Sequence, residues 1–328
     1  MVDIALIGAG RIGKIHGGNL ARQAGVRLRY VCDAVPQAAS ELAARLGATV
    51  ASLDQVFADA AIQAVAIASS TDTHAELILR AASARKAIFC EKPVDLDLGR
   101  AREVQAAVAT ARVPCLIGFQ RRYDPTFAAL KRRLDAGEIG EVEILSITSR
   151  DPAPPPIAYI ERSGGIFKDQ LIHDFDVCRW ILGDEAQTVY AAASCLVDPA
   201  IAKAGDADTT AVTIRTRKGR LCQINTSRRA AYGYDQRFEV LGSGGMLAAG
   251  NHRPTEVSWH RAGAISMDPP EPFFLERYRS AYAEEMVHFS AVLREEAAPR
   301  TGIEDGIRAL EIAEAATRSS KEGRVVAI

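Results

Sequence analysis

The sequence is poor in the features that mark nucleic-acid-binding, membrane-spanning and secreted proteins. Its 40 Lys and Arg residues are balanced by 41 Asp and Glu residues, and it has no basic run that could bind a row of phosphates. No apolar run approaches the ~20 residues of a membrane helix. The first apolar segment, Ile4–Ile7, starts almost at the initiator Met and lacks the charged and long apolar regions of a signal peptide. We therefore expect neither a nucleic-acid partner nor a membrane attachment.

Cysteine is also sparse, and its spacing excludes two common structural uses. The six cysteines stand singly in apolar segments, without the CxxC pairs of a zinc site or the density of a disulfide scaffold. They are Cys32, Cys90, Cys115, Cys178, Cys195 and Cys222. We expect buried free thiols and, with them, a location in the reducing cytoplasm.

The length of the chain and the order of its apolar segments predict two domains. A chain of 328 residues exceeds the size at which one hydrophobic core usually stops growing. Residues 1–120 alternate short apolar runs with amphipathic stretches, a βαβ pattern typical of a parallel sheet with helices on both faces. The predicted strands are Ile4–Ile7, Leu28–Cys32, Ala64–Ala68, Ala87–Cys90 and Cys115–Gly118, and the predicted helices are Gly13–Ala24, Pro36–Leu46, Leu53–Ala58, Thr73–Ala82 and Leu98–Thr110. Residues 1–120 are therefore predicted to form an α/β Rossmann domain with a doubly wound parallel sheet.

Residues 121–328 follow a different pattern, in which alternating strands lie between helices. Strands of period two that are joined by short turns indicate a largely antiparallel open sheet. The predicted strands are Val142–Thr148, Val189–Leu196, Thr209–Thr216, Leu221–Ser227 and Arg237–Leu241, and the predicted helices are Pro125–Ala136, Ile166–Leu182, Phe274–Glu295 and Glu304–Ser319. We predict an α+β domain whose last helix packs back on the Rossmann domain.

A glycine-rich turn follows the first predicted strand. Residues 8–13 read Gly-Ala-Gly-Arg-Ile-Gly, a G-x-G-x-x-G motif that opens a helix, as a dinucleotide site requires. Gly8 permits the tight turn, Gly10 lets backbone N–H groups approach a pyrophosphate, and Gly13 allows close packing of the helix. Arg11 and Ile12 lie in the same turn and are predicted cofactor contacts. The alternative is a glycine-rich connection without a ligand.

An acidic residue at the end of the second strand favours NAD as the cofactor. Asp33 lies twenty positions after Gly13, where a carboxylate accepts hydrogen bonds from the adenine ribose hydroxyls and repels a 2′-phosphate. A neighbouring basic side chain could still allow NADP, and an ordinary turn aspartate is the alternative reading.

A hydroxyl-rich segment after the third predicted strand of the first domain could also line the cofactor. Ser69, Ser70 and Thr71 lead into a helix together with His74. Their hydroxyls either contact the cofactor or cap the helix. His74 is placed with the cofactor contacts, with a structural or rim position as its alternative.

Oxidation of an alcohol needs a base for the hydroxyl proton, a positive group near the developing alkoxide, and a fixed distance to the nicotinamide. The segment Glu91-Lys92-Pro93 stands at the carboxyl end of a strand, the edge of an α/β sheet where ligands bind. Pro93 disfavours a helix at Lys92, so the ammonium group can point into a cleft. A solvated lysine before a turn proline is the alternative.

A second candidate cluster lies on the helix predicted over 166–182. Asp169, His173 and Asp176 stand at i, i+4 and i+7, and would share one stripe of that helix. An imidazole, with its ordinary pKa near ~6.5, suits proton acceptance at neutral pH, and Asp169 could orient it. The alternative is a solvated helix face. An Asp–His pair could also bind a metal, but no third or fourth ligand is evident and we expect none.

Together these residues resemble the Gfo/Idh/MocA oxidoreductase family over essentially the whole chain. The resemblance rests on the glycine motif, on Glu91-Lys92-Pro93, on residues 118–124 (Gly-Phe-Gln-Arg-Arg-Tyr-Asp), and on Gly164-Gly165 followed by Asp169 and His173. Within the family the chain is most similar to the members that oxidise inositols. The more specific matches are residues 149–156, 172–176 and 232–237.

The resemblance implies a role for each candidate side chain. His173 is then the base, Asp169 is its partner, and Lys92 gives electrostatic support and touches the cofactor. Glu91 would help to position Lys92 or the ribose. The implied contacts with substrate hydroxyls are Lys92, Asp169 and His173, together with Arg121, Asp151, Asp176, Tyr232 and Tyr234.

The resemblance also implies an activity and an assembly. The expected reaction is NAD-dependent oxidation of myo-inositol to 2-keto-myo-inositol (scyllo-inosose). The alternatives are the same chemistry on scyllo-inositol, an amino-inositol or a glucose-type pyranose, and a ligand-sensing module without turnover. Residues 121–328 would bind the substrate and form a homodimer or, more in keeping with the resemblance, a homotetramer.

Overall fold

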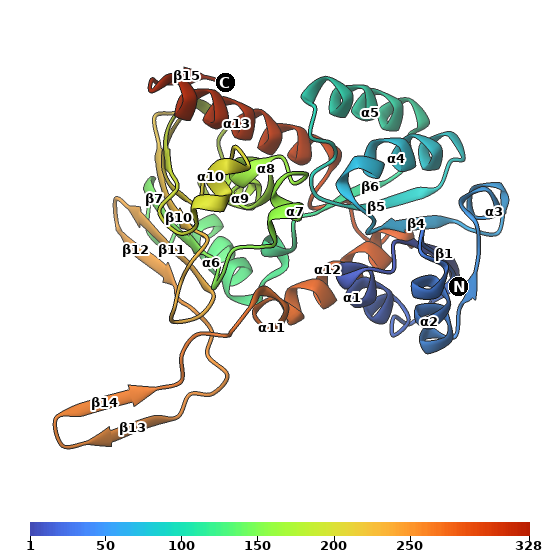
Figure 1. The fold of residues 1–328 in the computed structure, drawn as a ribbon, viewed down its shortest axis with the longest axis horizontal. Helices are drawn as coiled ribbons and strands as arrows, with labels where there is room; N and C mark the ends of the chain where they lie inside the picture. Colours follow the sequence, from blue (N-terminus) through green and yellow to red (C-terminus); the bar gives the residue numbers. More distant parts are fainter. The chain divides into compact units, whose positions relative to one another are not determined.

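The computed structural model describes residues 1–328, which form two compact units (Figure 1). The first unit comprises Met1–Tyr123 and Ala281–Leu310, and the second comprises Asp124–Ser280 and Glu311–Ile328. Each unit therefore combines segments that are far apart in the sequence. No helix in either unit has the length and apolar character needed to cross a membrane.

The first unit contains the predicted Rossmann sheet. Its six strands all pair in parallel, in the order β3-β2-β1-β4-β5-β6. The strands are β1 (Val2–Ile7), β2 (Val26–Cys32), β3 (Thr49–Val50), β4 (Ala64–Ile67), β5 (Ala87–Glu91) and β6 (Cys115–Gly118). The order reverses between β1 and β4, and ligands bind outside the carboxyl ends of the strands at such a point. The short strand β3 is the one strand of this sheet that the sequence analysis missed.

Helices cover both faces of this sheet, with α4 and α5 on one face and α1 and α2 on the other (Figure 1). The helices are α1 (Arg11–Leu20), α2 (Pro36–Leu46), α3 (Leu53–Ala58), α4 (His74–Ser83) and α5 (Leu98–Ala111), with short 3₁₀ turns η1 (Thr71–Thr73) and η2 (Gln120–Tyr123). The predicted bounds of α2 and α3 are confirmed, because both helices carry strong end signals. Pro36 opens α2 and Gly47 ends it in the left-handed conformation, while Ser52 and Gln55 form a capping box on α3.

A helix from the C-terminal part of the sequence completes the core of the first unit. Met286, Phe289 and Val292 of α12 (Arg279–Leu293) are buried in the same core cluster as the strands of the Rossmann sheet. The ring of Phe289 lies 5.8 Å from that of Phe89 on β5. The sequence analysis gave this role to the last helix, α13 (Ile303–Glu322), of which only the part up to Leu310 belongs to the first unit. It also predicted one helix where the structure has two, α11 (Phe274–Arg277) and α12.

The second unit is built on a seven-stranded sheet, in the order β12-β11-β7-β10-β9-β8-β15. Its strands are β7 (Val142–Arg150), β8 (Ala186–Ser194), β9 (Thr209–Thr216), β10 (Leu221–Ser227), β11 (Asp235–Gly242), β12 (Gly245–Ala249) and β15 (Val326–Ala327). Only β7 and β10 pair in parallel, so the prediction of a largely antiparallel sheet is confirmed.

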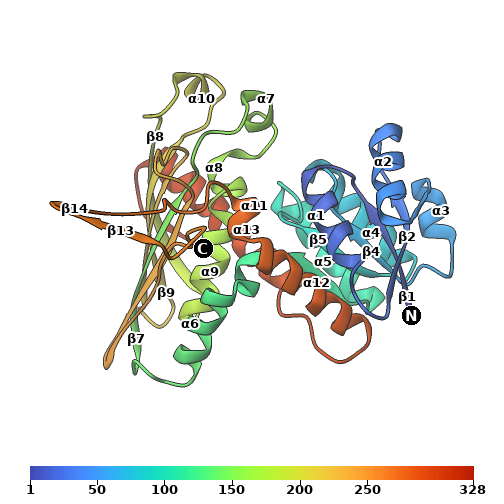
Figure 2. The ribbon, with the colours of Figure 1, turned by 90° about the horizontal axis from the view of Figure 1, so that it is seen from below.

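One face of this sheet carries helices and the other does not (Figure 2). The helices of this unit are α6 (Pro125–Asp135), α7 (Ile157–Ile160), α8 (Gly165–Asp169), α9 (Ile172–Leu182), α10 (Pro199–Lys203), α11 and the C-terminal part of α13. Figure 2 shows α6, α9 and α13 on the covered face. Burial alternates residue by residue along β9 and β10, as expected where one face packs on helices and the other stays exposed.

A two-stranded hairpin, which the sequence analysis missed, projects from the second unit on the uncovered side of the sheet (Figure 2). Its strands are β13 (Ser258–Arg261) and β14 (Ala264–Met267). Every residue of β13 is exposed, so the period-two burial by which a strand is found in a sequence is absent here.

The packing of α12 gives a stability prediction. Phe289→Ala should lower the free energy of unfolding of the first unit by about 3–5 kcal/mol, because the ring is fully buried in the core. Val287→Ala, at a position 42% exposed on the same helix, should change it by less than about 0.5 kcal/mol. Hydrogen exchange of the β1 and β5 amides measures both changes within the first unit. Equal effects of the two substitutions would contradict the assignment of α12 to this core.

Candidate active site

The glycine turn between β1 and α1 has the geometry of a pyrophosphate cradle. Gly8 has a φ of +105°, and a Cβ there would lie 2.4 Å from the carbonyl oxygen of Ala68. A Cβ on Gly13 would lie 1.9 Å from the carbonyl oxygen of Gly8, so only glycine lets α1 pack this closely. A Cβ on Gly10, in contrast, would meet no atom within 4 Å. The turn is therefore tightly packed on its protein side and open at Gly10, where a pyrophosphate would approach the start of α1.

The first turn of α1 presents the remaining motif residues. The helix begins at Arg11, directly after Gly10, and the N–H of Lys14 donates to the carbonyl oxygen of Gly10. Arg11 is exposed and Ile12 is half-buried. The dipole of α1 and its free N–H groups thus face the open side of the turn, which fits a dinucleotide phosphate.

Asp33 fastens the same turn to the end of β2. Its Oδ2 accepts a hydrogen bond from the N–H of Ala9 at 2.6 Å, and its Oδ1 accepts one from the N–H of Val35 at 2.7 Å. The carboxylate thus has the structural role that a turn aspartate would have. Each oxygen keeps a further lone pair that can accept a hydrogen bond from a ribose hydroxyl, so the two readings of Asp33 are compatible.

The segment after β4 is held together by its own hydrogen bonds. The hydroxyls of Ser69 and Thr73 lie 2.6 Å apart, and Thr73 also donates to the carbonyl oxygen of Ser70. No side chain caps η1 or α4, so the capping reading of these hydroxyls is wrong. Ser70 is exposed and Thr71 is half-buried, which leaves both accessible to a cofactor.

His74 is a structural residue in this arrangement. Its Nδ1 lies 2.7 Å from the carbonyl oxygen of Pro93, and its Nε2 lies 3.2 Å from that of Ser69. The side chain is buried, and burial lowers the pKa of the imidazole although both carbonyls favour its charged form. His74 thus links the loops that follow β4 and β5 through both ring nitrogens, which is a structural position.

Glu91 and Lys92 stand at the carboxyl edge of the Rossmann sheet. Glu91 is the last residue of β5, and its Oε1 lies 2.6 Å from Nε2 of His16 on α1. A Cβ on Gly118 would lie 3.0 Å from Glu91 Oε2, so this glycine leaves space for the carboxylate. Lys92 follows in a loop and is half-buried, and the Lys92–Pro93 peptide bond is cis. The predicted non-helical position of Lys92 is confirmed, and the chain bends there.

The predicted continuous helix over 166–182 is wrong. Helix α8 ends at Asp169, and α9 begins at Ile172. The N–H groups of Gln170 and Leu171 both donate to the carbonyl oxygen of Ile166, which interrupts the regular helical hydrogen bonding for two residues. Asp169 therefore ends one helix and His173 lies in the first turn of the next, so they do not form the predicted single stripe.

Two side chains that the sequence analysis missed hold Asp169. The hydroxyl of Tyr159 donates to Asp169 Oδ1 at 2.8 Å, and Nη1 of Arg228 lies 3.9 Å from Oδ2. Arg228 is 1% exposed and also donates to Asp206 at 3.1 Å. Burial and the charge of Asp169 raise the pKa of Tyr159 well above its ordinary value, so the phenol remains a donor. Asp169 thus accepts a hydrogen bond from a neutral phenol and lies near a buried guanidinium.

The predicted substrate contacts differ in how far their side chains are exposed. Asp176, one turn after His173 on α9, has no exposed surface, and Arg121 and Tyr234 are 2% and 5% exposed. Asp151 is half-buried, in the loop after β7, and its N–H donates to the carbonyl oxygen of Ser227. Among these four, Asp151 is the residue whose exposure favours a direct contact.

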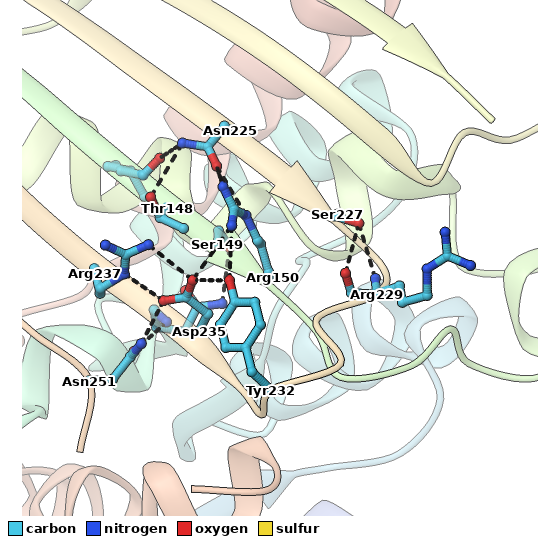
Figure 3. Close-up of polar contacts among 12 residues, drawn as sticks. Thr148, Ser149, Arg150, Asn225, Ser227, Arg229, Tyr232, Asp235, Arg237 and Asn251 are labelled. Atoms are coloured by element: carbon cyan, nitrogen blue, oxygen red, sulfur yellow. Dashed lines mark hydrogen bonds and ion pairs between the residues drawn. The ribbon is translucent and has the colours of Figure 1, made fainter. Parts of the chain in front are cut away.

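Tyr232 belongs to a polar network on the uncovered face of the second sheet (Figure 3). Its hydroxyl donates to Asp235 at 2.5 Å and accepts from Arg150 Nη1 at 2.8 Å. Ser149 is fully buried, and because side chains alternate along a strand, Arg150 lies on the opposite face from Ser149. The helix α9, which carries His173, packs on the covered face (Figure 2). This placement argues against the predicted substrate contact of Tyr232.

The fold and the first unit's side chains define a dinucleotide-binding oxidoreductase. Comparison with known families agrees: residues 2–119 match the model of an oxidoreductase family with an NAD-binding Rossmann fold, and residues 127–248 match the GFO/IDH/MocA C-terminal domain. The chain belongs to the Gfo/Idh/MocA oxidoreductase family, and its cofactor is NAD.

Several proteins and solved structures are similar to this chain over its full length. The chain is 47% identical to an inositol 2-dehydrogenase of Rhizobium meliloti over 100% of this chain and 99% of the relative. A solved myo-inositol dehydrogenase from Corynebacterium glutamicum superposes with a TM-score of 0.96 at 42% identity, covering 100% of this chain and 99% of that one. A scyllo-inositol dehydrogenase from Lactobacillus casei was solved with NAD(H) and scyllo-inositol. It superposes with a TM-score of 0.92 at 28% identity, covering 100% of this chain and 99% of that one.

The position of Asp33 gives a prediction about cofactor choice. The native protein should use NAD in strong preference to NADP, and Asp33→Asn should narrow that preference by about 10–100-fold, as expected when a hydrogen bond to a charged group worth about 1.5–3 kcal/mol is lost. Asn keeps one acceptor oxygen for the N–H of Ala9, while the N–H of Val35 loses its acceptor at an exposed position where water can replace it. Steady-state kcat/KM with each cofactor measures the ratio. Comparable efficiency of the native protein with both cofactors would show that Asp33 does not face the ribose.

Proposed function

We propose that this protein is an inositol 2-dehydrogenase, which oxidises myo-inositol to 2-keto-myo-inositol and reduces NAD. The observation that carries the proposal is the full-length similarity to the Rhizobium meliloti inositol 2-dehydrogenase. The site supports it, because the first unit offers a glycine turn that fits a dinucleotide and a lysine at the carboxyl edge of the same sheet, while the second offers His173 in the first turn of α9 and Asp169, which contacts Tyr159 and Arg228. Such an enzyme would act in myo-inositol catabolism.

Each of the three proposed catalytic side chains has one task. His173 accepts the hydroxyl proton of the substrate, and Asp169, held by Tyr159 and Arg228, orients the imidazole and stabilises its charged form. The ammonium group of Lys92 stabilises the oxygen as its negative charge develops. NAD, when bound at the glycine turn, supplies the hydride acceptor for the C–H bond that breaks as the C=O bond forms. Lys92 lies in the first unit and the other two in the second, so the proposal requires one substrate to meet both.

A second candidate is the same reaction on another inositol. The Lactobacillus casei structure was solved with scyllo-inositol, and its name assigns it that substrate. The catalytic side chains would serve either isomer equally. A glucose-type pyranose or an amino-inositol would use them in the same way.

The substrate is tested by following the absorbance of NADH. Purified protein with NAD should reduce the cofactor fastest with myo-inositol when myo-inositol, scyllo-inositol and glucose are compared in parallel. A higher kcat/KM with scyllo-inositol or glucose would replace the proposed substrate, while no NADH with any of them would favour a ligand-sensing module.

Substitution of the proposed base, compared with substitution of an exposed histidine, tests the mechanism. His173→Ala should lower kcat by roughly 10²–10⁴-fold, the usual contribution of a general base. His260→Ala is the control, because His260 is exposed on the projecting hairpin. A turnover number of His173→Ala equal to that of the control would remove His173 from the role of base.

We further propose that the chain assembles into a homotetramer through the uncovered face of the second sheet and its hairpin. Large apolar side chains are exposed on both features, and such a patch is typical of a contact surface. On the sheet they are Tyr190, Leu221, Leu241 and Met246, and on or beside the hairpin Val257, Trp259, Ile265 and Met267. Because the same face would meet in each copy, closed symmetry is expected.

Charge substitution on the hairpin tests this assembly. Trp259→Lys combined with Ile265→Lys should shift the native tetramer to smaller species in sedimentation velocity, since these side chains are 59% and 67% exposed in the single chain. Val50→Lys, on the edge strand β3 of the first unit, should leave the assembly intact. A native protein that sediments as a monomer would contradict the proposal.

The protein is further expected to act in the cytoplasm. All six cysteines are free thiols, and five of them are buried. Free thiols are typical of proteins in a reducing compartment.

A further inference from the structure

A buried cluster of three ionisable side chains lies in the first unit, behind the strand end that carries Lys92. His16 comes from α1, Glu91 from β5 and Glu285 from α12. One nitrogen or oxygen atom of each lies within 4.8 Å of the corresponding atoms of the other two. Because these residues are far apart in the sequence, no local motif indicates the cluster.

Glu285 is the unusual member of this cluster. It has no exposed surface, and neither of its carboxyl oxygens has a hydrogen-bond partner. An ionised carboxylate in such a place would carry a large desolvation penalty without compensation. The side chain must therefore be neutralised, either by a proton or by a bound cation.

The geometry of the other two residues favours the proton. Nε2 of His16 and Oε1 of Glu91 are 2.6 Å apart, which is a hydrogen-bond distance. Two ligands of one metal ion, each about 2.0–2.2 Å from it at an angle of 90° or more, stand ~3 Å or more apart. The hydrogen bond thus occupies the atoms that a metal ion would need.

The surroundings of the cluster leave no place for a second negative charge. The His16 ring packs edge-on against Phe89 at 4.8 Å and against Tyr282 at 5.6 Å. The ionisable groups that lie near Glu285 are His16 on α1, Glu91 on β5 and the phenol of Tyr123 on η2. None of them is a permanent cation, so no fixed positive charge compensates a negative charge on Glu285.

We propose that Glu285 is a neutral carboxylic acid and acts as a positioning residue. It keeps Glu91 hydrogen-bonded to His16, and this bond fixes the position of Lys92, the next residue in the chain. The proposal rests on the proposed role of Lys92. Glu91 directly precedes Lys92, and His16 lies on the helix that begins at the glycine turn. A second negative charge at Glu285 would repel Glu91, disturb its bond to His16, and shift Lys92 relative to the cofactor turn.

The expected pH dependence follows from the same contacts. Burial, and next the charge of Glu91, raise the pKa of Glu285 well above its ordinary value. A carboxyl group with a raised pKa in the folded state binds its proton more tightly there than in the unfolded chain. Its contribution to stability is therefore complete below the unfolded pKa and is lost as the pH rises through the folded pKa. Activity should decline over the same alkaline range.

The test is Glu285→Gln, which replaces the neutral acid by a neutral amide of nearly the same shape. At neutral pH its kcat and KM should stay within about twofold of the native values, as for a volume-conserving change. At alkaline pH its kcat should decline later than that of the native protein, by about one pH unit or more. Glu284→Gln, at the exposed neighbouring position on α12, should keep the native pH profile.

Infrared spectroscopy measures the proton directly and needs no substrate. The spectrum of the native protein minus that of Glu285→Gln at neutral pH should contain the carbonyl stretch of a carboxylic acid. If this band is present but no tested polyol is oxidised, the proposed function fails while the protonation of Glu285 stands. Absence of the band overturns the proposal.

Three further results would also count against it. One is a loss of activity in Glu285→Gln at neutral pH while Glu284→Gln remains active. Another is one equivalent of a divalent metal ion per chain, found by elemental analysis of the native protein and absent from Glu285→Gln. The third is an alkaline decline that is unchanged in Glu285→Gln, which would leave Glu285 without a positioning role.

Discussion

The hydrogen bond between Glu91 and His16 is the constraint on which the proposed site depends. It joins the strand that ends beside Lys92 to the helix that begins at the glycine turn, so the cofactor cradle and the lysine are held as one body. Gly118 leaves room for the carboxylate, and α12 closes the cluster from behind with Glu285. A segment from late in the sequence thus completes the cofactor side of the site, whose sequence motifs lie in the first third of the chain.

Three carboxyl groups have different environments, and we infer a different role for each from its environment. Asp169 accepts a hydrogen bond from a phenol and lies near a buried guanidinium. Asp33 accepts two backbone hydrogen bonds and shapes the turn that it also serves. Glu285 has no partner, so its neutral form is the one compatible with burial. The same chemical group can therefore act as the partner of a base, as a recognition element or as an uncharged spacer.

Local patterns predicted much of the fold and part of the site. The Rossmann strands and helices α2 and α3 follow from apolar runs and end signals, and the roles of Gly8, Gly10 and Gly13 follow from their spacing. The break between α8 and α9 has no such signal, because both segments have helical composition. The partners of Asp169 and the Glu285 cluster arise from contacts between distant segments. Tyr232 was assigned by resemblance alone, and its hydrogen bonds to Arg150 and Asp235 hold it on the uncovered face.

The central claim is that Lys92 of the first unit and His173 of the second act on one hydroxyl of a bound polyol. A crystal structure of the protein with NADH and 2-keto-myo-inositol tests it most directly. The account predicts that Lys92 Nζ and a ring nitrogen of His173 both lie within hydrogen-bond distance of the same ketone oxygen, close to the nicotinamide C4. A ketone oxygen that contacts neither side chain would contradict it.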